Sequence, residues 1–456
     1  MVMTKQFRKS DLKSKTFLPS LIPAALALLV CAYMPVSSQA QLISTDSYEV
    51  GVAPDVWFNS VDGVIVGLRF RGEDPRTFLD GPHRINAGVW LGTRIPDTPV
   101  SYMFNYAHPV ERISSPQNEG AIHLRSSIRT GVHRHEAGLS KRWQPGFDEY
   151  ETFELEGFAG LYYRFDHDYL LYEELWQESP VLYFRTNAKK RDRNLLGRWT
   201  ASLTATAGLP ADTDDPFINF AYESGGHPEA LGTEGLFGQA QLELLQHISM
   251  PAGFSVRTRL FGGFSSDAVP PELRYSVSEA ASFDQLRSPL TRAKGTIPVD
   301  WVRSGWVHVA GGPALRGYTM QTTDSREAGV MGWVQHAIAM NLDFYYPNPI
   351  NTYFAKIPYL GDVLRLESYL FTDAGLMYQS DAENALTGDA GKPEWQQLLL
   401  NTGAGFMLSF NIPDYLGRDR GFFIRYEIPF WVSEVPGDED NFDIRHVLGV
   451  GSQFRF

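Results

Sequence analysis

Two short stretches of the sequence contain residue types that form strong polar contacts in proteins. GGPALRGY contains Arg316 between Leu315 and Gly317, and FTDAG contains Asp373. A carboxylate that leaves water needs a cation or several hydrogen-bond donors, because an unpaired buried charge is costly. A guanidinium suits this role because its planar fork can donate two parallel hydrogen bonds to one carboxylate. We therefore expect an ion pair between Arg316 and Asp373 that ties the two stretches together.

Two other groups of residues give weaker signals for chemistry. HRHE, from His133 to Glu136, puts both histidines on one face of a strand, where they could bind a metal ion. No third ligand is evident, so we expect neither a metal nor a cofactor. Ser265 and Ser266 fall at an expected strand end, but no spacing fixes a nucleophile beside a base. The sequence therefore does not predict an enzyme.

The segment that contains Asp373 alternates in polarity with a period of two residues. From Leu364 to Tyr378 one face is uncharged and the other holds every charged residue, and the alternation recurs in DGVIVGLRF, GFFIRYEIPF and Phe442–Phe456. Strands of a transmembrane β-barrel alternate in this way, with apolar residues toward lipid and polar residues toward the lumen. Many of the segments run about ten to fifteen residues, and about nine to eleven are enough to cross an outer membrane. The pattern predicts an all-β chain with Asp373 facing a lumen.

Turn residues between the alternating segments define the candidate strands. They lie near 62–72, 83–94, 99–110, 119–129, 131–143, 152–165, 180–187, 196–208, 215–223, 235–248, 253–265, 301–311, 330–346, 363–379, 397–411, 421–432 and 442–456. Single-chain bacterial barrels have an even number of strands. We therefore expect sixteen, with one strand miscounted between residues 119 and 190. The segment Ser265–Val299 is rich in proline and charge, which predicts a long surface loop.

The first forty residues have the layout of a cleaved export signal. Five basic residues precede an apolar run that Pro19, Pro23 and Pro35 interrupt, and the segment finishes on Ser-Ser-Gln-Ala. A membrane helix would need about twenty uninterrupted apolar residues, so we expect cleavage after Ala40 instead. Cys31, the only cysteine, lies in this segment, so no disulfide can form after it. The expected organisation is a signal peptide over residues 1–40, a short periplasmic segment over 41–61 and an outer-membrane antiparallel β-barrel over 62–456.

The charge of the chain bears on its partners. The formal net charge is −13, which argues against a nucleic-acid partner because nucleic acids are recognised through basic patches. The export signal and the alternating strands together predict a location in the outer membrane of a Gram-negative-type bacterium, with outer-membrane lipid around the barrel.

On these motifs the sequence resembles the BamA-type superfamily of outer-membrane assembly and translocation barrels, which carry a bacterial surface antigen barrel domain. In that family a Val/Leu-Arg-Gly-Phe/Tyr motif in the sixth outer loop folds into the lumen. There it contacts the acid of a Phe-x-Asp-x-Gly motif on the thirteenth strand. The match implies a lumenal loop motif of Leu315, Arg316, Gly317 and Tyr318. The implied partners on the barrel wall are Asp343, Phe371, Asp373 and Gly375, with Asp343, from NLDFYYP, on the twelfth strand.

The resemblance also implies protein partners. Many members carry periplasmic POTRA domains, but residues 41–61 are too few to bury a core. A separate periplasmic partner protein would have to supply them. Phe454 and Phe456, at the end of the last expected strand, resemble the signal by which the outer-membrane assembly machinery selects its clients.

Glycines mark the expected seam where the barrel closes. Gly449 and Gly451 fall on the lumenal face of the last expected strand, and Gly63 and Gly67 on that of the first. A strand position without a side chain packs weakly, so we expect the wall to open sideways there. This favours a barrel that assists insertion or translocation of polypeptides, or of lipids. A passive pore for small solutes and a rim-located outer-membrane enzyme remain as alternatives.

Overall fold

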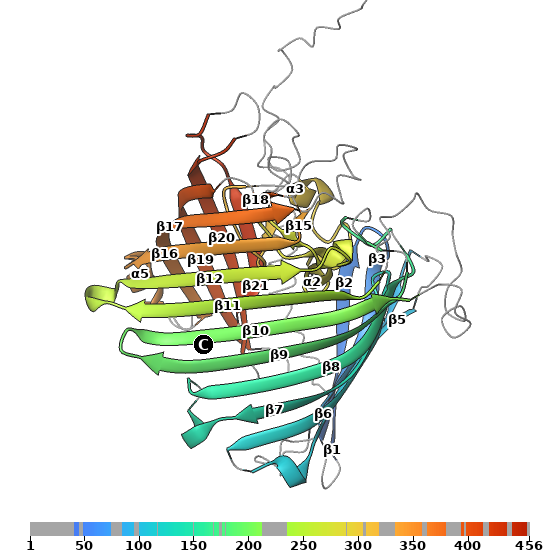
Figure 1. Cartoon of the computed structure of the whole chain (residues 1–456). Helices are drawn as coiled ribbons and strands as arrows, with labels where there is room; N and C mark the ends of the chain where they lie inside the picture. The colour runs from blue at the N-terminus through green and yellow to red at the C-terminus, as the bar shows by residue number, and fades with distance from the viewer. Residues whose placement is uncertain are drawn as a thin grey trace, which may run out of the picture.

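The structure, a computed structural model shown in Figure 1, describes most of the chain after the expected signal. The described residues are 41–44, 49–73, 84–94, 100–115, 117–148, 150–166, 168–172, 176–177, 179–211, 235–288, 290–303, 307–318, 333–357, 363–379, 394–395, 398–413, 419–435 and 440–453. Phe454 and Phe456 lie outside them, so the expected assembly signal stays a prediction.

One large sheet dominates the fold. Its long strands are β2 (Glu49–Asn59), β3 (Gly63–Glu73), β4 (Arg84–Gly92), β5 (Val100–Pro109), β6 (Asn118–Arg129), β7 (Val132–Trp143), β8 (Thr152–Arg164), β9 (Val181–Asn194), β10 (Gly197–Pro210), β11 (Phe237–Ser249), β12 (Ser255–Ser265), β16 (His336–Tyr346), β17 (Leu364–Gln379), β19 (Leu399–Pro413), β20 (Asp419–Val432) and β21 (Val447–Gln453). Each pairs antiparallel with the next in this order. The sheet curves along this order (Figure 1), so the predicted all-β antiparallel architecture is confirmed.

Helices and short strands occupy the connections. The helical turns are η1 (Glu111–Ile113), η2 (Pro145–Phe147), η5 (Pro251–Gly253), η6 (Pro271–Leu273), α2 (Ser282–Gln285), α3 (Val299–Arg303) and α5 (Ile350–Phe354). The short strands are β1 (Gln41–Ser44), β13 (Tyr275–Ser276), β14 (Val307–Val309), β15 (Trp333–Val334) and β18 (Glu394–Trp395). Within the described residues, no helix combines the length and apolar character that a membrane crossing requires.

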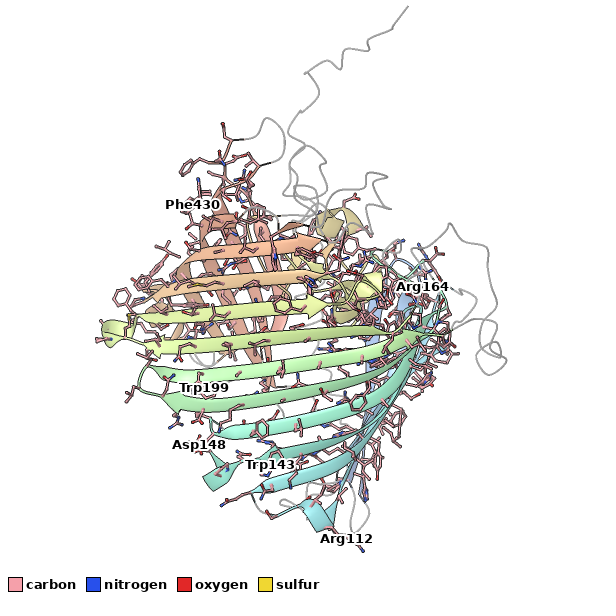
Figure 2. The ribbon with its side chains drawn as sticks, viewed as in Figure 1. Arg112, Trp143, Asp148, Arg164, Trp199 and Phe430 are labelled. Carbon is pink, nitrogen blue, oxygen red and sulfur yellow. The ribbon has the colours of Figure 1, made fainter. Side chains whose placement is uncertain are left out.

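One face of the sheet is apolar although it is exposed. On β3, Val64, Val66 and Leu68 are 44%, 51% and 49% exposed. Exposed apolar side chains recur on most of the other long strands, among them Val89, Leu124, Leu139, Leu182, Phe184, Leu203, Leu242 and Leu370. Trp143, Trp199 and Phe430 lie near strand ends (Figure 2). An apolar face of this extent, bordered by aromatic residues, is typical of a wall that faces lipid.

The position of the first long strand differs from the expectation. β2 falls within residues 41–61, which were expected to precede the barrel, and pairs with β3 from Glu49–Glu73 to Asn59–Gly63. The predicted first strand, 62–72, is therefore the second long strand. Pro54 lies in the middle of β2, and proline argues against an interior strand because it lacks a backbone N–H. Among the described residues β1 pairs only with Glu49–Val52, so the outer edge of β2 has no partner strand at Pro54, and a residue without an N–H is tolerated there.

Short segments pair with the outer edges of the first and last long strands. β1 pairs antiparallel with β2, and β14 pairs parallel with β21 from Val307–Leu448 to Val309–Val450. Among the described residues β2 and β21 do not pair with each other. The edge of β21 is therefore covered by a segment of the same chain and not by the first long strand.

The connection between β12 and β16 is largely buried. Tyr275 and Val277 belong to one apolar cluster with Leu315, and Phe283 packs against the rings of Tyr162 and Tyr183. The prediction that Ser265–Val299 is a surface loop is wrong, because most of its described side chains are buried. Counted from β2, this connection is the sixth at its end of the sheet.

Candidate functional site

Tight backbone packing positions the LRGY motif inside the sheet. Ala314 adopts a positive φ of 55°, and the backbone N–H of Leu315 donates to the carbonyl of Val277 at 3.0 Å. A Cβ atom on Gly317 would lie 2.6 Å from Val432 Cγ1 and 2.7 Å from Asn401 Cβ. Because those distances are shorter than carbon–carbon contacts allow, only glycine fits at this position.

Arg316 and Asp373 form the pair that the sequence predicts. The Arg316 Nε donates to Asp373 Oδ2 at 3.0 Å and Nη2 donates to Oδ1 at 2.6 Å. The backbone N–H of Arg316 adds a third bond to Oδ2 at 3.1 Å, and Asn341 Nδ2 donates to Oδ1 at 3.0 Å. Asp373 is 0% exposed and Arg316 is 5% exposed. The carboxylate is thus fully engaged by donors, as a buried charge requires.

Two further carboxylates contact the same guanidinium. Arg316 Nη1 lies 2.7 Å from Asp343 Oδ1 and donates to Glu427 Oε1 at 3.1 Å. The hydroxyl of Tyr369 donates to the same Oε1 at 2.7 Å, and Arg425 lies 3.8 Å from it. Asp343 lies on β16 and Asp373 on β17, the twelfth and thirteenth long strands, where the resemblance places them. Glu427, on β20, is part of the site but was not among the predicted residues.

The other motif residues pack around this ion cluster. The Arg316 guanidinium carbon lies 4.0 Å from the centroid of the Phe371 ring. Gly375 leaves room for Leu315, since a Cβ there would lie 2.8 Å from Leu315 Cδ1. The Tyr318 hydroxyl lies 3.0 Å from the Leu400 carbonyl, to which it donates. The structure therefore brings every residue predicted for the loop motif and its wall partners together at one site.

The charge balance keeps Arg316 ionised. Burial alone would lower the pKa of its guanidinium, but Asp343, Asp373 and Glu427 outweigh that effect and raise the pKa well above its ordinary value. A cation that cannot lose its proton is unsuited to proton transfer. The site is suited to fixing the β12–β16 connection against β16, β17 and β20.

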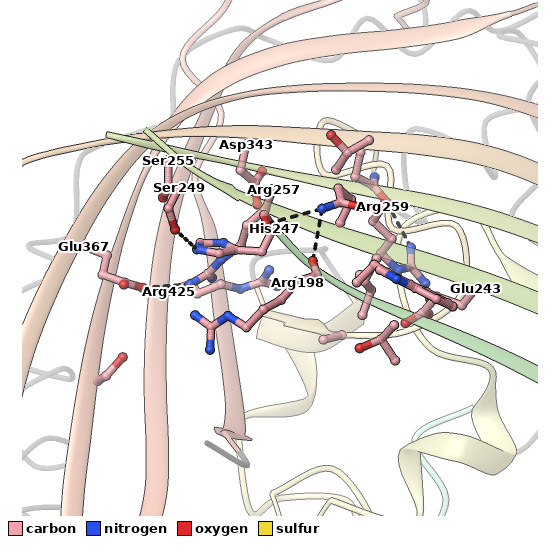
Figure 3. A pocket seen from close by; sticks show the side chains of 18 of the residues that line it. Arg198, Glu243, His247, Ser249, Ser255, Arg257, Arg259, Asp343, Glu367 and Arg425 are labelled. Atoms are coloured by element: carbon pink, nitrogen blue, oxygen red, sulfur yellow. Dashed lines mark hydrogen bonds and ion pairs between the residues drawn. The ribbon is translucent and has the colours of Figure 1, made fainter. Parts of the chain in front are cut away.

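A polar cavity adjoins the ion cluster. It has a volume of about 1660 Å³, and Arg316, Asp343 and Arg425 contribute to its wall. Figure 3 shows His247 in its lining together with charged side chains of both signs, including Arg198, Glu243, Arg257, Arg259 and Glu367. Arg259 bridges the wall and the connection, because it donates to Glu243 Oε2 and to the Gly312 carbonyl, both at 2.7 Å. A lining of this kind is typical of a water-filled lumen.

The expected glycine seam is not found at the predicted place. Gly67 lies on β3, between Asp55 of β2 and Trp90 of β4, and the Trp90 ring fills the space above it. Gly63 is the first residue of β3, directly after a turn, with a φ of 72°, and it pairs with Asn59 of β2 and not with the last strand. The prediction that Gly63 and Gly67 oppose the last strand is wrong, because β2 precedes them.

The glycines of the last strand lie in β21. Gly449 pairs with Arg425 and with His308 of β14, and Gly451 pairs with Phe423. A Cβ on Gly449 would lie 2.8 Å from Arg425 Nε, so this position is closely packed. The small residue makes room for a guanidinium here and does not weaken the strand by leaving space.

The histidines of HRHE and Ser265, which the sequence offered as weaker candidates, contact neighbouring protein groups. His133 stacks on Tyr163 with ring centroids 4.3 Å apart, and His135 Nδ1 lies 2.9 Å from the Ser126 hydroxyl. Ser265 donates its hydroxyl proton to the Gln335 carbonyl at 2.6 Å. Within the described residues, no group of three or more His, Cys, Asp or Glu side chains could hold a metal ion.

Glu279 lies in the buried connection, and we expect it to make the stability of the fold depend on pH. Its Oε1 accepts a hydrogen bond from Tyr172 at 2.9 Å, and burial raises its pKa from 4.5 to about 7. The folded carboxyl therefore holds its proton more tightly than the unfolded one. This contribution to stability is present below about pH 4.5 and is lost as the pH rises through about 7, on the order of 3 kcal/mol in total.

Hydrogen exchange of residues 271–285 at pH 5 and pH 8 measures this dependence. Exchange should be faster at pH 8, after correction for the intrinsic rate, and Glu279→Gln should remove most of the difference. An unchanged difference in the variant would show that another group is responsible.

Comparisons with known proteins give no family assignment. No family model matches the sequence, and neither does any curated protein. Among solved structures, BamA from Haemophilus ducreyi lacking POTRA domains 1–3 is 12% identical with a TM-score of 0.40, over 88% of this chain and 70% of that one. CdiB from Escherichia coli is 10% identical with a TM-score of 0.43, over 90% and 63%. Pseudomonas aeruginosa OccK2 (OpdF) is 8% identical with a TM-score of 0.29, over 89% and 95%.

Proposed function

We propose that this protein is a β-barrel of a Gram-negative-type outer membrane that assists the insertion or translocation of polypeptides, or of lipids, at the edge of its last strand. The observation that carries the proposal is the parallel pairing of β14 with β21. An extended client can add to an exposed strand edge through main-chain hydrogen bonds. Here the edge of β21 is occupied by three residues of the same chain, which a longer client strand can displace.

The ion cluster at Arg316 supports the same proposal. It fixes the motif of the β12–β16 connection to the wall, while β14 of that connection lies against β21. The connection thus has one part fixed to the wall by ion pairs and another part, β14, that lies on the edge of β21 and packs against an apolar cluster with Tyr172 and Val302. We propose that a separate periplasmic protein delivers the client, and that the assembly machinery folds this barrel during its own biogenesis.

Liposomes that contain the purified protein test the proposal. They should fold an unfolded outer-membrane barrel client about tenfold faster than empty liposomes, a rate change that corresponds to about 1.4 kcal/mol of activation free energy. Folding is followed by protease protection and by heat-dependent migration of the client. Liposomes that contain the same amount of a small closed β-barrel serve as the control.

The alternative with structural support is a passive pore for small solutes. The polar cavity of about 1660 Å³ favours it. Ion conductance in planar bilayers, combined with no effect on client folding, would identify the pore and contradict the assembly function.

A further inference from the structure

Three arginines from separate parts of the chain line a second cavity in the sheet interior. Arg69 lies on β3, Arg129 ends β6, and Arg292 belongs to the β12–β16 connection between α2 and α3. All three line a cavity of about 1190 Å³, together with Asp55 of β2. This cavity is separate from the Arg316 ion cluster.

These guanidinium groups have no anionic partner within the described residues. No hydrogen bond or ion pair joins Arg69, Arg129 or Arg292 to a carboxylate there, and the buried Nε of Arg69 has no hydrogen-bond acceptor. Arg129 instead stacks over Trp90, with its guanidinium carbon 3.9 Å from the ring centroid. A buried donor without an acceptor is costly, so the Nε of Arg69 calls for an explanation.

Two acids that line the cavity accept hydrogen bonds from uncharged groups. Asp55 accepts a hydrogen bond from Trp90 Nε1 at 2.9 Å. Asp62, which lines the same cavity, accepts from the Tyr169 hydroxyl at 2.6 Å and from Asn59 Nδ2 at 2.8 Å. Within the described residues neither acid forms an ion pair with Arg69, Arg129 or Arg292.

The electrostatics of Arg292 agree with this geometry. Burial and the charge of Arg69 together lower the pKa of its guanidinium from 12.5 to about 10, and Asp55 opposes the change. At neutral pH the group is still charged, and within the described residues it forms no ion pair with the acids that line the cavity, which are Asp55, Asp62, Glu136, Glu154, Glu156, Glu243 and Asp284. Arg316 is the contrasting case, because its three carboxylates raise the pKa of its guanidinium.

Backbone contacts fix Arg292 in place. Its N–H donates to the Ser288 carbonyl at 3.0 Å. Two residues later, Lys294 N–H donates to the Tyr169 carbonyl at 2.7 Å and the Lys294 carbonyl accepts from the Ser60 N–H at 3.2 Å. Hydrogen bonds thus join the connection to Ser60, directly after β2, and to Tyr169. They fix the backbone close to Arg292.

We propose that Arg69, Arg129 and Arg292 form a binding site for a phosphate group. Three guanidinium groups and the one carboxylate that opposes them leave an excess of about two positive charges, and a phosphate ester carries about −1.5 to −2 at pH 7. Guanidinium forks match phosphate oxygens through paired hydrogen bonds. The group can belong to free phosphate or to a lipid headgroup, because both present the same oxygens. This inference does not depend on the proposed function.

Calorimetric titration of the full-length protein in a nonionic detergent at low salt tests the site. Inorganic phosphate is the first probe and dihexanoyl phosphatidic acid is the second. Arg292→Gln should raise the dissociation constant about tenfold to a hundredfold, the usual range for a lost charge-assisted hydrogen bond. Asp55→Asn should lower it, because it removes the opposing charge. Retained heat-dependent migration confirms that each variant is folded.

Arg198→Gln is the matched control, since Arg198 is a lumenal arginine that lines the other cavity. It should leave phosphate binding unchanged. Saturable binding of inorganic phosphate that Arg292→Gln weakens supports a free-phosphate site, and binding of phosphatidic acid alone with the same sensitivity supports a headgroup site. Equal weakening by Arg198→Gln and Arg292→Gln, or no saturable binding of either probe, would overturn the proposal.

Discussion

Replacing Arg316 with alanine should destabilise the folded protein by about 3 to 5 kcal/mol, because it removes the cation that Asp343, Asp373 and Glu427 share. Asp373 and Glu427 are both 0% exposed, so water cannot replace the guanidinium without a rearrangement. Arg425 remains, but it lies 3.8 Å from Glu427 and, within the described residues, forms no hydrogen bond or ion pair with Asp373. The β12–β16 connection should therefore loosen, which protease cleavage near Gly317 and the thermal unfolding midpoint would both detect.

Arg365→Ala is the matched control for this substitution. Arg365 lies on β17, the same strand as Asp373, and pairs with Glu367 at 3.3 Å, but its side chain is 73% exposed. Solvent screens such a pair, so its loss should cost at most about 1 kcal/mol. Arg316→Lys should fall between the two, because the ammonium keeps the charge and loses the paired hydrogen bonds. If Arg316→Ala were as stable as Arg365→Ala, the ion cluster would not be what holds the connection.

The Arg316–Asp373 pair could be predicted because the alternation of polarity and the LRGY motif both indicated it. Alternation along Leu364–Tyr378 assigned Asp373 to the charged face of its strand, and the LRGY motif supplied a cation in a connection. The structure joins them by two parallel hydrogen bonds. Period-two patterning fixes the face of every residue on a strand, and this is why the strand partners were found.

Glu427 was missed because patterning does not give the register between strands. It lies on the charged face of GFFIRYEIPF, so the sequence did indicate that it points inward. Its approach to Arg316 depends on the pairings of β17 with β19 and of β19 with β20. Those registers are set by turns and by the packing of the whole sheet, which no single segment reveals.

The buried connection could not be predicted from its composition. Proline and charged residues are usual in exposed loops, and Ser265–Val299 is rich in both. Its acids are instead paired with distant tyrosines, as in the bonds from Tyr162 to Glu272 and from Tyr172 to Glu279. Burial of a charged residue depends on partners that are far away in sequence. Local composition therefore gave the wrong answer for this segment.

The segment on the edge of the last long strand is β14 and not the first long strand, so a different crosslink is needed to test whether this edge opens. Val66, on β3, pairs with Val56 and Leu91, so a crosslink from Val66 to the last strand has no structural basis. The partner on the outer edge of β21 is β14, through only three residue pairs. At about 0.5 to 1.5 kcal/mol for each net hydrogen bond, the backbone hydrogen bonds of this pairing contribute a few kcal/mol. The packing of Val307 with Tyr172 and Leu448 adds to them. Under the proposed function, a client strand that forms more backbone hydrogen bonds displaces it.

A disulfide between cysteines at positions 307 and 448 should abolish client folding when it is formed and restore it when it is reduced. Val307 and Leu448 are partners in the parallel pairing, so the bond would keep β14 on the edge of β21. A client could then no longer add to that edge. The rate of client folding in liposomes should fall at least about tenfold toward that of empty liposomes, as expected when a barrier rises by about 1.4 kcal/mol or more.

The control places cysteines at positions 426 and 448, which are partners in the antiparallel pairing of β20 with β21. This crosslink shares Leu448 and the oxidation step, but it joins two strands that the proposal keeps paired throughout. The oxidised control should therefore fold clients at the wild-type rate. Full activity with β14 locked would mean that clients do not use this edge, and the passive pore would then be the better account of the fold.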